Sequence, residues 1–143
     1  YMNETRFLKL HDADDNSVII LAQTMITLCQ AQQNGNGHKH TLIYINSEDI
    51  NSITVNEAPE KIYQLLEDTK IKYQFLKLHD ADDNSVIILN QELVSLAKAQ
   101  NVNNKKQTII FIKSDDINSI TVNEASEKIY QLMTDNNLNA SKG

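Results

Sequence analysis

Apolar and polar residues alternate at the start of the chain and resume after a polar turn. In "FLKL" (7–10), Leu8 and Leu10 lie on one face of an extended segment, because side chains alternate across a strand. The run "DADDNS" (12–17) is rich in residues that favour turns, and "VIIL" (18–21) continues with β-branched residues typical of strands. These segments together predict a β-hairpin whose loop is longer than two residues.

The pattern then continues through further strands and ends on a helix. Residues 22–33, and the corresponding segment 90–101, which matches at only four of twelve positions, fit either a strand or a short helix, and we favour a strand. The run "TLIYI" (41–45) is apolar on both faces, which predicts a central strand. "NSITV" (51–55) alternates cleanly, and "EAPEKIYQLL" (57–66) has apolar residues three and four positions apart, which predicts a helix docked on the sheet.

A proline and two glutamates mark the start of this helix. Pro59 fits the first helical position, where its missing N–H costs nothing. Glu57 and Glu60 are acids that suit the positive end of the helix dipole.

The whole pattern occurs twice. The fifteen residues of "FLKLHDADDNSVIIL" return unchanged at 75–89, and twenty of the twenty-six residues at 41–66 match those at 108–133. Similarity of this extent indicates a tandem duplication.

The duplication predicts an α+β fold built from two tandem copies. Each copy would be a small antiparallel β-meander of about five strands closed by a C-terminal helix, and the two would pack as a pseudo-twofold dimer. The first repeat covers residues 1–68, a linker covers 69–74, and the second repeat with a polar tail covers 75–143. A lone unit of about 60 residues would bury a marginal core, so pairing would add stability. The joining surface could be a sheet face, a sheet edge or the two helices.

Charge and composition narrow the classes of partner and location. The net charge of −6 over 143 residues argues against nucleic-acid binding, which needs clustered Lys and Arg. The single cysteine, Cys29, corresponds to Ala97 in the second repeat, which indicates a small packing residue. No apolar run approaches a membrane span, and the first residues do not resemble a signal peptide, so we expect a cytoplasmic protein with no membrane partner.

The sharpest candidate for chemistry is the turn "HDADDN", present in both repeats. Its carboxylates could bind Ca²⁺, and its histidine could add a nitrogen ligand for a transition metal. The candidate metal ligands are His11, Asp12, Asp14, Asp15, His79, Asp80, Asp82 and Asp83. The turn lacks the central glycine and final glutamate of an EF-hand loop. The favoured interpretation is therefore a solvated turn in which Asp and Asn side chains bond the local backbone.

Other combinations of reactive residues are weaker. "HKH" (38–40) is replaced by "KKQ" (105–107) in the second repeat, as expected for a variable exposed loop. Gly35 and Gly37 lie in "NGNG" without the lysine or spacing of a phosphate-binding loop. No Ser/His/Asp or Cys/His set appears in both repeats. We therefore predict that the protein is not an enzyme and carries no cofactor.

The order of motifs resembles the FlbD-like family of small flagellar-associated proteins. The resemblance rests on a strand "FLKL", a turn, "VIILNQEL" with Asn at the strand end, a strand pair, and the helix starts "VNEAPEKI" (55–62) and "VNEASEKI" (122–129). It covers each repeat nearly end to end. The chain departs from the family in having Ala58 and Ala125 where a capping Ser is usual, in lacking a glycine in the hairpin turns, and in its longer middle loop. The resemblance implies a related fold and a small adaptor or assembly protein, and it offers no catalytic residues.

The first hypothesis is accordingly a non-enzymatic structural or interaction protein, an adaptor or assembly factor. It would use a sheet edge or the divergent loops to bind a protein partner or itself. The alternative is a metal-binding module that uses the two "HDADDN" turns for Ca²⁺ or a transition metal.

Overall fold

The computed structural model describes residues 6–33, 39–67 and 74–142. Most of the predicted linker (69–74) and the loop that holds Gly35, Gly37 and His38 lie outside these residues. Within the described residues the chain is α+β, with ten strands in three antiparallel sheets and two helices. Neither described helix is long and apolar enough to cross a membrane.

The two repeats contain the same elements in the same order. The first repeat has β1 (Phe7–His11), β2 (Val18–Ala22), the 3₁₀ turn η1 (Gln23–Met25), β3 (Ile26–Gln33), β4 (Lys39–Ile45), β5 (Ser52–Val55) and α1 (Pro59–Glu67). The second has β6 (Phe75–His79), β7 (Val86–Asn90), the 3₁₀ turn η3 (Gln91–Leu93), β8 (Val94–Val102), β9 (Lys105–Ile112), β10 (Ser119–Val122) and α2 (Ser126–Lys142). The ambiguous segments 22–33 and 90–101 are thus each a short turn followed by a strand, which confirms the preference for strands.

Local sequence accounts for these elements. Leu8 and Leu10 are buried while their neighbours on the opposite face are exposed or partly exposed, as the alternation in β1 predicts. Pro59 is the first residue of α1, and Ile62 and Leu66 are fully buried on its apolar stripe. In the second repeat, Asn90 caps η3 by accepting a hydrogen bond from the Glu92 N–H at 3.1 Å.

A single meander per repeat is not what the sheets show. The largest sheet has the order β5-β4-β3-β7-β6, so three strands of the first repeat continue into two strands of the second. The β1-β2 hairpin forms a separate two-stranded sheet, and β10-β9-β8 forms the third. Consecutive strands β2 and β3 belong to different sheets because the turn η1 redirects the chain between them, and η3 separates β7 from β8 in the same way.

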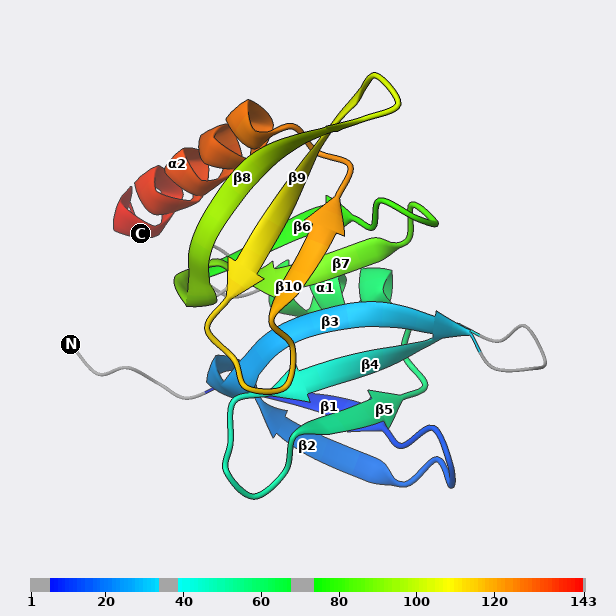
Figure 1. Cartoon of the computed structure of the whole chain (residues 1–143). Helices are drawn as coiled ribbons and strands as arrows, with labels where there is room; N and C mark the ends of the chain where they lie inside the picture. Colours follow the sequence, from blue (N-terminus) through cyan, green and yellow to red (C-terminus); the bar gives the residue numbers. More distant parts are fainter. Residues whose placement is uncertain (1–5, 34–38, 68–73, 143) are drawn as a thin grey trace.

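Two isolated bridges connect the three sheets into one series of strands. Asp12 pairs with Val55, which brings β1 beside β5, and Asp80 pairs with Val122, which brings β6 beside β10. The series therefore runs β2-β1-β5-β4-β3-β7-β6-β10-β9-β8. Its two end strands, β2 and β8, lie at opposite ends of the molecule (Figure 1).

The repeats are joined through a sheet edge. β3 of the first repeat pairs antiparallel with β7 of the second, with Leu28 opposite Leu89 and Cys29 opposite Ile88. A twofold arrangement would also pair β8 with β2, but no sheet formed by the described residues contains that pair. The expected pseudo-twofold packing is therefore not confirmed.

The hydrophobic cores cross the boundary between the repeats. Phe75 and Ile88 of the second repeat belong to the core under the first, and Leu28 of the first repeat belongs to the core under the second. Helix α1 packs against both β3 and β7 and lies behind this strand pair, the joint between the two repeats, in Figure 1. The Asn90 side-chain N–H donates to the buried Ile26 carbonyl at 3.0 Å, adding a polar bond across the joint.

Candidate functional site

The acidic turn between β1 and β2 is closed by its own backbone and carboxylates. The Asp12 N–H donates to the Ser17 carbonyl at 2.8 Å, and the Asn16 N–H donates to the Asp12 carbonyl at 2.9 Å. Asn16 has a left-handed backbone (φ 62°), which asparagine tolerates better than most residues. Asp12 Oδ1 accepts from the Asp14 N–H at 2.7 Å, and Asp15 Oδ1 accepts from the Ser17 N–H at 3.0 Å.

The second turn, at residues 80–85, repeats these bonds at nearly the same distances. In each turn a serine hydrogen-bonds to the aspartate two residues before it. These bonds from Ser17 lower the pKa of Asp15, and those from Ser85 lower the pKa of Asp83. Asp15 and Asp83 therefore stabilise their turns as hydrogen-bond acceptors.

The histidine of each turn binds a glutamate that precedes the helix. His11 Nδ1 lies 2.6 Å from Glu57 Oε2, and the His11 backbone N–H donates to Glu57 Oε1 at 3.0 Å. His79 makes the same pair with Glu124, at 2.7 Å through Nδ1 and 3.0 Å through the backbone. Both oxygens of each glutamate are thus engaged by one histidine.

The Glu57 carboxylate is largely sheltered from water, with 15% of its side chain exposed. Burial raises its pKa, but the hydrogen bonds from the His11 side chain and backbone outweigh burial, and the net pKa is lowered. The buried Thr41 hydroxyl donates to the Glu57 carbonyl at 2.5 Å, and Thr108 does the same for Glu124 at 2.8 Å. Glu57 therefore ties β1 and β4 to the start of α1, and does not act only as a helix-start acid. Glu60 does lie in the first turn of α1.

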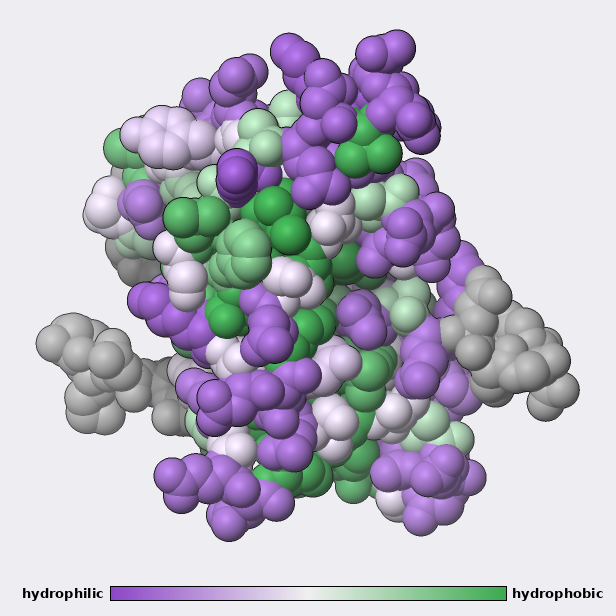
Figure 2. All heavy atoms as spheres, in the orientation of Figure 1, coloured by the Kyte–Doolittle hydropathy of each residue, from purple (hydrophilic) through white to green (hydrophobic). Residues whose placement is uncertain are grey.

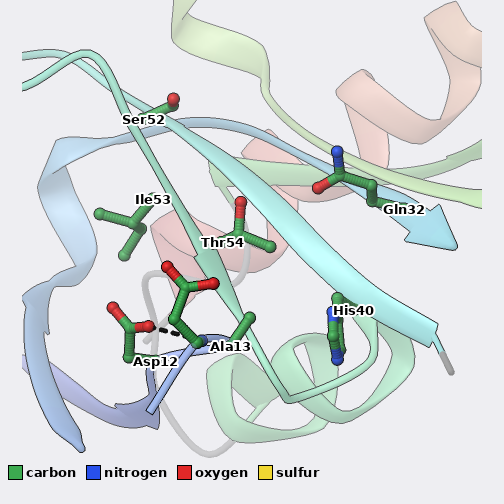
Figure 3. Close-up of a pocket in the computed structure, with 8 residues that line it drawn as sticks. Asp12, Ala13, Gln32, His40, Ser52, Ile53 and Thr54 are labelled. Carbon is green, nitrogen blue, oxygen red and sulfur yellow. Dashed lines mark hydrogen bonds between the residues drawn. The ribbon is translucent and has the colours of Figure 1, made fainter. Parts of the chain in front are cut away.

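The hollow beside the first turn is open and polar. It encloses about 530 Å³ and is lined by Asp12, Ala13, Asp14, Gln32, His40, Ser52, Ile53 and Thr54. Figure 3 shows Asp12 bonded to the neighbouring backbone, with His40 on the opposite side of the hollow, on β4.

The described residues contain no group of three or more His, Cys, Asp or Glu side chains that could hold a metal ion. The structure places His11 beside Glu57 and His79 beside Glu124, and the aspartate oxygens beside backbone N–H groups. The metal site at these turns remains a prediction, and no contact described above favours it.

The exposed end strand β2 is a second candidate site. It contains Val-Ile-Ile-Leu, as β7 does, yet the two strands have opposite environments. Ile20 in β2 is 70% exposed, whereas its counterpart Ile88 in β7 is fully buried against β3. Phe7, on the neighbouring strand β1, is also exposed, whereas its counterpart Phe75 is buried.

The other end strand, β8, differs from β3 in the same way. Leu96 in β8 is 52% exposed, whereas its counterpart Leu28 in β3 is fully buried. Every residue of β8 after Val94 is exposed, although β9 pairs with its other side. Figure 2 shows hydrophobic residues, in green, over β8 and β9 and again at the bottom, around β2. Leu96 on β8 and Phe111 on β9, which lie opposite each other in the sheet, are both exposed. A long, open, partly apolar strand edge is a site for pairing with another strand.

Comparisons with known proteins give no parallel for these features. The chain matches no protein-family model, no curated protein and no solved structure. Any functional assignment therefore depends on the geometry of the chain alone.

Two parts of the candidate site were not predicted from the sequence: the His–Glu pairs and the exposed strand edges. The sequence pattern presents Glu57 as a helix-start acid, although the similar His-to-Glu spacing in the two repeats, 46 and 45 residues, is also compatible with a fixed pair. The exposed edges could not be found from sequence, because β2 and β7 carry the same four apolar residues.

Proposed function

We propose that the chain is a non-enzymatic interaction protein that joins polypeptides through the edges of its sheets. Edge β8 accepts an extended strand of a protein partner, and β2 is the strand that the chain offers at its other end. One observation carries this proposal: β2 and β8 expose apolar residues whose counterparts in β7 and β3 are paired and buried.

The turn chemistry supports a role in assembly rather than in catalysis. His11 and His79 each hold both oxygens of a glutamate and connect strands to a helix start, and the aspartates close their own turns. The similarity of the two halves supports a tandem duplication, in which these contacts were copied with the whole unit. The resemblance to the FlbD-like family and the cytoplasmic location stay predictions, and both agree with an adaptor or assembly role.

A synthetic peptide with the sequence of residues 84–91, "NSVIILNQ", tests the edge directly, because it contains the strand that β3 already accepts. We expect the peptide to change the amide chemical shifts of ¹⁵N-labelled protein along β8 and on the face of α2 beside it. The control peptide has proline at the position of Ile88, because proline cannot donate to the strand ladder. Equal shifts with both peptides, or no change along β8, would contradict the proposal.

A further inference from the structure

We infer that the partner of each free edge is a second copy of this chain, bound head to tail. β2 of one chain would pair antiparallel with β8 of the next and continue the strand series. This inference rests on the proposed function, and it commits that function to one partner.

The joint inside the chain shows what such a contact requires. β3 accepts β7, and the same Val-Ile-Ile-Leu run stands at the start of β2. β8 in turn keeps the apolar positions of β3, with Leu96 at the position of Leu28 and Ala97 at the position of Cys29. A second copy therefore presents to β8 a strand of nearly the same sequence as the one that β3 binds.

The internal register predicts the register between chains. Inside the chain, Leu28 faces Leu89, Cys29 faces Ile88 and Gln30 faces Ile87. The corresponding pairs between two chains are Leu96 with Leu21, Ala97 with Ile20, and Lys98 with Ile19. This pairing covers Leu96 and Ile20, two of the large apolar side chains that a single chain leaves exposed.

The helix beside each edge supports the same arrangement. Helix α1 packs on β3 and reaches across to β7, and α2 packs on β8 in the corresponding place. At the internal joint, Lys77 Nζ lies 5.6 Å from the centre of the Tyr63 ring, within cation–π range. The counterparts are Lys9 and the exposed Tyr130, so we expect Lys9 of one chain to lie over Tyr130 of the next.

The positions of the two edges exclude mutual pairing in the structure described. β2 and β8 lie at opposite ends of the molecule (Figure 1), so each needs a different neighbour. A contact that joins two different surfaces is heterologous, and repeated addition gives a ring if the rotation closes and an open filament if it does not.

Cysteine pairs test the predicted register. Opposed residues on antiparallel strands have Cα atoms about 4.5–5.5 Å apart, which a disulfide can span. In a Cys29→Ala background, we expect an Ile20→Cys chain mixed with an Ala97→Cys chain to form disulfide dimers. Each chain alone should give few, and the double variant should give a ladder of oligomers. Homodimers from either single variant in equal yield would overturn the head-to-tail arrangement.

A matched control uses Glu48→Cys, an exposed position in the loop between β4 and β5. Mixed with Ala97→Cys, it should give no more dimer than the single variants. Equal yield from this mixture would show that cross-linking reports random collision and would overturn the register.

Sedimentation of the unmodified chain supplies an independent measurement. We expect mass to rise with concentration from micromolar to millimolar, and Ile20→Lys to weaken association about tenfold or more by placing a charge in the joint. A monomer throughout this range would overturn self-association. If the peptide of residues 84–91 still bound β8, the proposed function would stand with another partner, whereas failure of both measurements would remove both proposals.

Discussion

Truncating the same residue in its two copies gives a sharp test of the structure. Ile88 and Ile20 occupy corresponding positions in fifteen-residue segments that are identical in sequence. Ile88 is fully buried opposite Cys29 at the joint, whereas Ile20 is 70% exposed. Local sequence effects therefore cancel, and any difference between Ile88→Ala and Ile20→Ala comes from the surroundings of the two strands.

The expected magnitudes follow from burial. Removing three carbons from a fully buried isoleucine costs about 2–5 kcal/mol, since lost transfer energy and a residual cavity add together. Ile20 keeps less than a third of its side chain covered, so the same truncation costs below about 1 kcal/mol. The gap between the two variants is large compared with the error of a denaturation measurement.

Urea unfolding followed by circular dichroism measures both values. The protein is kept at low concentration, so that association through β2 does not add to the stability of the parent chain. We expect a large fall in the midpoint for Ile88→Ala and a small one for Ile20→Ala. Similar falls for both variants under these conditions would refute the assignment of β7 to the joint and of β2 to the free edge.

Three further predictions concern the turns and the cysteine. Glu57→Gln should lower the free energy of unfolding by about 1 kcal/mol at neutral pH. Because the pKa of Glu57 is lowered in the folded state, the parent's advantage is present above about pH 4.3 and is lost as the pH falls through the folded pKa. Urea unfolding at several pH values measures this, and a gap between the two proteins that does not change with pH would contradict it. Titration with Ca²⁺ or Zn²⁺ should give no heat and no change in Tm, since oxygens of Asp12 and Asp15 already accept hydrogen bonds from backbone N–H groups. Saturable binding that is lost in Asp12→Asn would restore the metal-binding alternative. Burial raises the pKa of Cys29 and hides its thiol, so a thiol reagent should modify it only after unfolding, and rapid modification of the native chain would contradict the packing around β3.

The elements themselves were predictable because local pattern determines them. The alternation in 7–10, the turn at 12–17 and the proline at the start of α1 each carry a local signal that the structure confirms. The strand at 26–33 was harder, because its apolar residues are buried on both faces and so show little period.

The arrangement of the strands was not predictable, because the repeats compete for the same partners. β3 could pair with β2 of its own repeat or with β7 of the other, and both present Val-Ile-Ile-Leu. The shared apolar run cannot separate these choices, which differ in the geometry of the 3₁₀ turns, in the helix packed behind the joint and in the Asn90 bond to Ile26. The His11–Glu57 pair was missed for a related reason: the two residues lie 46 positions apart and meet only when β1 comes beside β5.

The buried Asn90 side chain makes the β3–β7 joint within a chain stronger than the proposed β8–β2 joint between chains. Its bond to the Ile26 carbonyl crosses the internal joint, but the corresponding residue on β2 is Ala22, which has no side-chain donor. The internal joint is also continuous in the chain, so its strands cannot diffuse apart. Dilution or mechanical force on an assembly would therefore separate whole chains from one another before it opened any single chain. Such an assembly could exchange its subunits while each remained folded.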